Sequence, residues 1–163
     1  MSVLFFALGG LKPFGETERN LRTPTIKNLR RRQDLNEELT AAFEKHHEET
    51  QAQIERLEDV FAMIEKKPQG KTCAAIVGIV EEGAEIMQEY KGSPALDAGL
   101  LAAAQAVEHY EISRYGTLAT WAEELGLEDA VSLLQETLEE EKATDKALGE
   151  IAKTAVNQQA KAS

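Results

Sequence analysis

The segment Ala104-Gln105-Ala106-Val107-Glu108-His109-Tyr110-Glu111-Ile112-Ser113-Arg114-Tyr115 decides the fold of this chain. Read at helical spacing, Glu108 and Glu111 lie on one stripe with apolar residues on either side, namely Leu101, Ala104, Tyr115, Leu118, Ala122 and Leu125. Residues three apart on a helix are neighbours, so these carboxylates lie side by side on a face that should be buried. Burying two adjacent carboxylates is costly, because both lose hydration and they repel each other. A divalent metal ion would relieve both costs, and the segment therefore predicts a metal site inside a helical protein.

Length and composition predict one globular, helix-rich domain. The chain has 163 residues, of which 42% are hydrophobic and 29% charged, and it contains only four prolines. The net charge of −11 argues against nucleic acid or an anionic membrane surface as a partner. A single cysteine, Cys73, rules out an internal disulfide and a thiolate metal cluster. The apolar opening, Ser2 to Gly10, is too short to span a bilayer and has no signal-peptide pattern, so we expect a cytoplasmic protein.

The first 33 residues are atypical. Glycines and prolines interrupt the pattern, and a weak first helix from about Phe14 to Arg31 is supported only by Leu21, Ile26 and Leu29. Residues 34–156 form the predicted bundle core, and residues 157–163 a frayed polar tail.

Within the core, the sequence predicts three long helices and one short one. The first long helix runs from Asp34, which caps it together with Glu37, to about Pro68. A short amphipathic helix over 72–91 buries Ile76, Ile79, Val80, Ala84, Met87 and Tyr90, while Glu81, Glu82 and Glu85 face water. The second long helix starts at Ser93 or Asp97 and stops at Gly126, and the last runs from Glu128 into the 150s.

The connections predict how these helices pack. Very few residues join the last two long helices, which must therefore lie antiparallel. About thirty residues, including the short helix, separate the first long helix from the second, which is enough to cross the length of a bundle. Two antiparallel hairpins joined by such a crossover, with a short fifth helix in it, form a ferritin-like four-helix bundle.

Polar residues recur at the middle of the apolar stripe in three helices. We predict that His46, Glu49, Glu108, Glu111 and Glu141 bind metal, with Glu16 as the candidate from the first helix. Mid-helix positions of antiparallel neighbours lie at similar heights, so these groups should converge. Carboxylates with an imidazole suit iron or manganese. Glutamates bridging two such ions would let the pair bind and reduce dioxygen or peroxide.

Each candidate has an alternative role. His46 is otherwise a hydrogen-bonded core histidine, Glu49 a surface residue, and Glu141 part of a solvated acidic run. Asp145 is a ligand, a carboxylate that orients His46, or surface. Gln53 and Tyr115 are candidates for groups next to the ligands, although tyrosines at helical spacing also fit a core.

Two further features are interpreted as surface. The charges flanking the stripe of the first long helix, Arg56 among them, are assigned to solvent. Glu44 and His47 have the Glu-x-x-His spacing of a di-iron helix, but they share a polar face with Thr40 and Gln51, and we reject the match.

Several strings resemble the YciE/YciF family of ferritin-like bacterial stress proteins, in the family's order. They are Ala42-Phe43-Glu44-Lys45-His46, Glu48-Glu49-Thr50, Glu55-Arg56-Leu57-Glu58, Gly70-Lys71-Thr72-Cys73, Val107-Glu108-His109-Tyr110-Glu111-Ile112, Tyr115-Gly116-Thr117-Leu118 and Leu134 to Asp145. The resemblance implies a bundle related to rubrerythrin, two iron or manganese ions, a homodimer and a role in stress. Phe14-Gly15-Glu16 and Pro24 match the spacing of the family's first helix, which makes Glu16 the corresponding ligand. The apolar run between them is replaced here by Thr17 to Thr23.

The sequence therefore predicts a ferritin-like stress protein whose di-metal site reacts with peroxide or dioxygen. The alternative is a non-enzymatic dimeric helical scaffold with an incomplete metal site, which the altered first helix favours. An iron-storage cage is disfavoured, because nothing in the sequence indicates a cage-forming surface. The sequence does not identify the electron donor.

Overall fold

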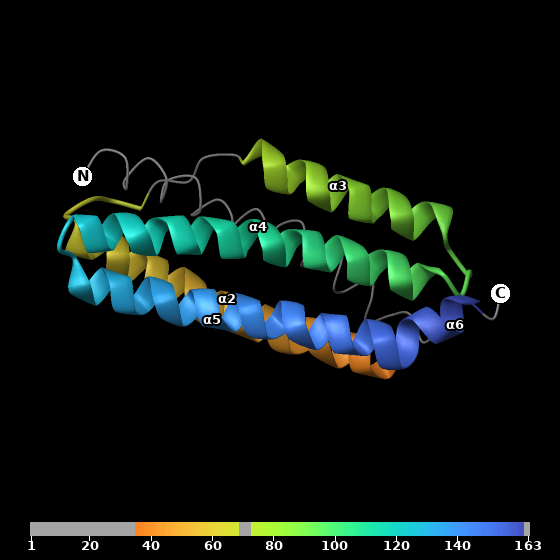
Figure 1. The fold of residues 1–163 in the computed structure, drawn as a ribbon. Helices are drawn as coiled ribbons and strands as arrows, with labels where there is room; N and C mark the ends of the chain where they lie inside the picture. Colours follow the sequence, from red (N-terminus) through yellow and green to blue (C-terminus); the bar gives the residue numbers. More distant parts are fainter. Residues whose placement is uncertain (1–34, 69–72, 162–163) are drawn as a thin grey trace.

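A computed structural model describes residues 35–68 and 73–161, and throughout these two ranges the regular secondary structure is helical (Figure 1). The weak first helix predicted within residues 1–33, with Glu16, lies outside the described residues. The helices are α2 (Glu37–Met63), α3 (Ala74–Glu89), α4 (Leu96–Glu124), α5 (Glu128–Ile151), a π-helical turn (Ala152–Val156) and α6 (Asn157–Lys161). The segment predicted as a polar tail thus begins where the structure has α6.

The helices are arranged as the loop lengths predict. Helices α4 and α5 lie side by side, α2 packs against α5, and α3 lies along α4 (Figure 1). Gly126, with φ of +68°, makes the tight turn between α4 and α5, as predicted for this glycine. The predicted all-α, ferritin-like bundle with a short helix in its crossover is confirmed. No helix in the described part of the chain combines the length and apolarity that a membrane span requires.

The starts of two helices differ from the predictions. Asn36, not Asp34, caps α2, because its Oδ1 accepts hydrogen bonds from the backbone N–H groups of Glu38 and Leu39 at 3.0 and 3.1 Å. The N-cap position of α4 is Ala95, so neither Ser93 nor Asp97 caps that helix. Asp97 instead accepts a hydrogen bond from the backbone N–H of Asn36 at 2.9 Å. This contact fixes the start of α2 against the start of α4.

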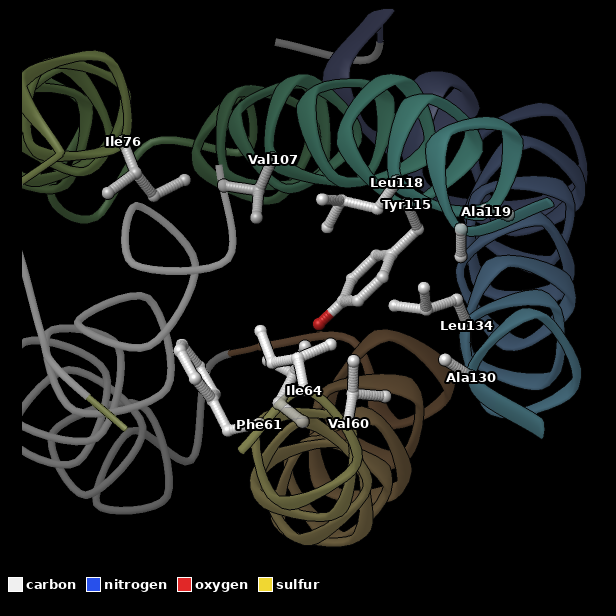
Figure 2. Close-up of a cluster of buried hydrophobic side chains, with 12 residues drawn as sticks. Val60, Phe61, Ile64, Ile76, Val107, Tyr115, Leu118, Ala119, Ala130 and Leu134 are labelled. Atoms are coloured by element: carbon white, nitrogen blue, oxygen red, sulfur yellow. The ribbon is translucent and has the colours of Figure 1, made fainter. Parts of the chain in front are cut away.

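The described residues form three apolar clusters, and the two larger ones lie at opposite ends of the bundle. The larger one, near the α4–α5 turn, joins α2, α4 and α5 through residues such as Phe61, Leu118 and Leu134, and Ile76 of α3 belongs to it as well (Figure 2). The other, around Leu39, Leu101 and Leu148, lies toward the opposite end. Their burial stabilises the bundle by about 25 cal/mol per Å² of apolar surface removed from water. Polar residues occupy the middle of the bundle, as the polar positions at the centre of the apolar stripes predict.

Helix α3 is less buried than predicted. Ile76 is its one fully buried residue, and Ile79, Val80, Ala84 and Met87 are half-buried. Tyr90 is exposed, which corrects the prediction: α3 ends at Glu89, so Tyr90 falls on the C-cap and leaves the apolar stripe. Glu81, Glu82 and Glu85 are exposed, as predicted.

Candidate metal centre

Four buried side chains from three helices meet at the middle of the bundle. His46 comes from α2, Glu108 and Glu111 from α4, and Glu141 from α5, and each offers one ligand atom within 4.8 Å of the others. Their relative exposures are 5%, 1%, 1% and 0%. The predicted burial of the Glu108 and Glu111 pair is confirmed. We refer to these four residues as the central cluster.

The imidazole of His46 lies between carboxylates of two different helices. Its Nε2 is 3.5 Å from Oε1 of Glu108, and its Nδ1 is 4.0 Å from Oε2 of Glu141. A protonated His46 would balance only one of the three carboxylate charges. Since charge is costly in a protein interior, a bound cation or protons on the acids would lower the cost of burying the other two carboxylates.

The donor set and its spacing fit a first-row transition metal. Oxygen and imidazole ligands suit iron or manganese. Metal–ligand bonds of about 2.1 Å would put ligands on opposite sides of one ion about 4.2 Å apart. The four ligand atoms lie within 4.8 Å of one another, which is close to this value, so small side-chain movements would close the cluster around an ion.

The predicted ligand Glu49 lies outside the central cluster. Lys45 Nζ contacts its Oε1 at 2.6 Å, in an i,i+4 pair on α2. Its Oε2 is buried and has no hydrogen-bond partner among residues 35–68 and 73–161. The Glu49 carboxylate is thus half-buried: one oxygen pairs with Lys45 at the surface, and the other points into the protein.

The other predicted residues have contacts of their own. Asp145 Oδ1 accepts from Gln105 Nε2 at 3.0 Å and lies 3.2 Å from His109 Nε2, so it joins α5 to α4 rather than orienting His46. Tyr115 belongs to the apolar cluster near the α4–α5 turn, where its ring points toward Ile64 (Figure 2). Glu44 and His47, the rejected Glu-x-x-His pair, are half-buried and lie outside the central cluster.

Sequence reasoning missed an ion-pair network between α2 and α5. Arg56, assigned above to solvent, has a side chain only 16% exposed and contacts both oxygens of Glu140 at 2.6 and 2.7 Å. Gln53 is buried, and its Nε2 donates to Oε2 of Glu140 at 3.1 Å. Burial works to raise the pKa of the Glu140 carboxyl, but the hydrogen bonds from Arg56 and Gln53 outweigh it and the pKa falls below its ordinary value. The hydrogen bonds that Arg56 donates to Glu140 also raise the pKa of the Arg56 guanidinium.

An apolar pocket adjoins the central cluster. His46 and Glu108 line one part of it, and the remaining lining comes from α2, α3, α4 and α5. Most of these side chains are apolar, among them Phe43, Met87, Leu100, Val107 and Leu148. Such walls keep the surroundings of the carboxylates low in polarity, which strengthens electrostatic interactions at the cluster.

The helical bundle, with buried carboxylates and a histidine at its centre, places this chain in the class of ferritin-like bundle proteins. More particularly, the chain belongs to the family described as "Domain of unknown function (DUF892)", whose model matches residues 16–161. The predicted membership of the YciE/YciF family is confirmed by a curated relative, "Protein YciF" of Escherichia coli K12. It is 49% identical over 126 residues, which are 77% of this chain and 76% of the relative.

Two solved structures agree with this assignment. The crystal structure of the E. coli stress protein YciF has a TM-score of 0.83 and 43% identity, with 96% of each chain covered. The protein YcfI from Rhodopseudomonas palustris has a TM-score of 0.82 and 41% identity, with 90% of each chain covered. At 41% and 43% sequence identity, the two structures support membership of the same family as well as a shared fold.

Proposed function

We propose that this protein acts in the stress response by holding two iron or manganese ions at a centre built around the central cluster, where they would react with peroxide or dioxygen. One observation carries the proposal: three carboxylates and an imidazole, all buried, offer ligand atoms within 4.8 Å of one another. The stress role is supported by the E. coli relative YciF, which is described as a stress protein.

The protein's own residues have distinct parts in this proposal. Glu108, Glu111 and Glu141 supply negative charge, and His46 binds through a neutral imidazole nitrogen. Glu49 and Glu16 are the candidates for completing a second metal position. When bound, the ions would supply one-electron reduction steps. The apolar pocket beside His46 and Glu108 would limit water at the centre and would offer space next to the cluster for a small neutral oxidant.

A second candidate function is a non-enzymatic dimeric scaffold with an incomplete metal site. The contact of Lys45 with Glu49 favours it, because that contact directs one oxygen of a predicted ligand toward the surface. The central cluster alone supplies four residues, which is few for two ions. On this alternative the buried polar groups specify how the helices pack.

The test compares two double variants of α4. Glu108→Gln with Glu111→Gln removes two carboxylates of the central cluster, whereas Glu123→Gln with Glu124→Gln removes two exposed carboxylates of the same helix. Each protein is purified without chelator, reconstituted with Fe²⁺ or Mn²⁺, and measured for bound metal, melting temperature and peroxide consumption. A ligand at 100 times its Kd stabilises the folded state by about 2.7 kcal/mol. We therefore expect the parent and the Glu123/Glu124 variant to bind metal, melt several degrees higher with it and consume peroxide.

The Glu108/Glu111 variant should lose all three properties. Less than a tenth of an equivalent of metal in the reconstituted parent would contradict the proposal. So would equal metal binding by the two double variants, since that would place the metal on the acidic surface. A Glu108/Glu111 variant more stable than the parent, even with metal present, would favour the scaffold.

A further inference from the structure

The network around Arg56 joins the two helices that contribute His46 and Glu141. Its guanidinium Nη1 and Nη2 donate to the two oxygens of Glu140, and Nη2 also donates to Glu136 at 2.7 Å. Nη1 lies 3.3 Å from the hydroxyl of Thr137, which is buried. A planar guanidinium bound to both carboxylate oxygens fixes direction as well as distance. The network thus restrains both the separation of α2 and α5 and the rotation of α5 about its axis.

The rotation of α5 decides where Glu141 points. Glu140 and Glu141 are consecutive, so their side chains leave the helix about 100° apart. With Glu140 held against Arg56, Glu141 is directed into the bundle, where it is fully buried and reaches His46. Thr137 is one turn before Glu141 on the same buried face, and its contact with Arg56 restrains that face directly.

Gln53 connects the network to the central cluster along α2. It lies seven residues, or two helical turns, after His46 on the buried stripe, and it shares Oε2 of Glu140 with Arg56. His46 and Gln53 therefore contact the same short segment of α5, at Glu141 and Glu140 respectively.

We infer that the Arg56–Glu140 pair is a positioning device, which sets the Glu141 carboxylate at the distance from His46 that metal binding requires. The inference rests on the proposed metal centre and adds to it two residues that contact no ligand position themselves. Residues that orient metal ligands typically change metal affinity by about 10- to 100-fold when they are removed.

Variants at Arg56 test the inference through metal affinity. Arg56→Met removes the pair, and Arg56→Lys keeps the charge but cannot bind both carboxylate oxygens in one plane. Glu140→Gln keeps the side-chain volume and serves as a second variant should Arg56→Met fail to fold. Two controls are matched: Lys142→Met removes a cation next to Glu141 that pairs with the exposed Glu139, and Val60→Ala destabilises α2 within its apolar end.

The Mn²⁺ dissociation constant is measured from the electron paramagnetic resonance signal of the free ion, and Co²⁺ absorption bands report ligand geometry. We expect Arg56→Met, Arg56→Lys and Glu140→Gln to raise the Kd about tenfold and to alter the Co²⁺ bands. Lys142→Met and Val60→Ala should stay within about twofold of the parent, because neither side chain takes part in the hydrogen bonds between Arg56 and Glu140.

Three results would overturn the inference while the parent still binds Mn²⁺. They are an unchanged Kd in Arg56→Met and Glu140→Gln, an Arg56→Lys variant equal to the parent, or an equal loss in either control. The second would show that charge alone suffices, and the third that net charge or general stability is responsible. A parent that binds no Mn²⁺ would instead overturn the proposed metal centre, and the positioning role with it.

Discussion

Three consecutive glutamates of α5 lie in three environments. Glu139 is exposed and pairs with Lys142, Glu140 is half-buried against Arg56, and Glu141 is fully buried in the central cluster. The cause is helical geometry, because successive side chains point about 100° apart. Within a single helical turn, Glu139 thus faces solvent, Glu140 pairs with a neighbouring helix, and Glu141 lies inside the bundle.

The middle glutamate should make stability depend on pH. The pKa of Glu140 in the folded protein is below the ordinary value of 4.5. Its contribution to the free energy of unfolding is therefore fully present above pH 4.5 and is lost as the pH falls through the folded-state pKa. We expect Glu140→Gln to reduce the free energy of unfolding at pH 7 by about 1–2 kcal/mol, because it removes a charge-assisted pair. Urea unfolding from pH 7 to pH 3 should show this difference shrinking at the acidic end.

The neighbouring residue provides the control for this measurement. Glu139→Gln alters an exposed i,i+3 pair, for which we expect less than about 0.5 kcal/mol at any pH. A difference for Glu140→Gln that stays constant down to pH 3 would contradict the role assigned to its charge.

The sequence predicts such roles unevenly. Glu108 and Glu111 could be placed inside because apolar residues flank them on one stripe. For Glu141 the sequence predicts a ligand but also allows a solvated acidic run, since its neighbours in sequence are also glutamates. Arg56 was assigned to solvent because its partners are about 80 residues away in the chain, and no local pattern encodes them.

At the scale of the helices, the sequence predicts which elements form better than where they begin. Gly126 could be identified as a stop because few other residues adopt a positive φ. The sequence predicts the cap of α2 at Asp34 because Glu37 follows three residues later, as in a capping box, but Asn36 is an equally good capping residue. What distinguishes Asn36 is partly a tertiary contact, its backbone N–H bonded to Asp97 of α4.

The contact between α3 and α4 depends on a glycine. A Cβ added at Gly99 would lie 2.6 Å from Cγ2 of Ile86, whereas one at Gly116 would meet nothing closer than 4.0 Å. The Ile86 methyl is attached at Cβ and cannot move aside without a rotamer change. We expect Gly99→Ala to destabilise the protein by about 1 kcal/mol through overpacking, despite the better helix propensity of alanine.

The matched variant Gly116→Ala should have the opposite effect. It gains helix propensity without a clash, for a stabilisation of about 0.5–1 kcal/mol. Urea unfolding of both variants measures the two signs. Equal stabilisation by both would mean that α3 is not held at the close approach seen between Gly99 and Ile86.

At the scale of the whole molecule, the bundle is apolar at both ends and polar at the centre. The apolar clusters hold α2, α4 and α5 together, and the central cluster draws charged groups from the same three helices. Helix α3 differs, since it contacts α4 and contributes one fully buried residue. The pattern of mid-stripe polar residues was enough to predict this division, because it recurs in all three long helices.

This division predicts how metal would change local stability. An ion bound by His46, Glu108, Glu111 and Glu141 stabilises only conformations in which α2, α4 and α5 remain together. Helix α3 supplies no member of the central cluster, and Ile76 is its one fully buried residue, so we expect it to open separately. In hydrogen exchange followed by mass spectrometry, saturating Mn²⁺ should slow exchange in the middle of α2, α4 and α5 by tenfold or more, while exchange in α3 stays within about twofold.

The Glu108→Gln, Glu111→Gln variant should show no Mn²⁺ effect. Equal slowing in all four helices would mean that α3 opens only when the whole bundle does, and slowing confined to the exposed acidic residues would mean that the ion binds at the surface.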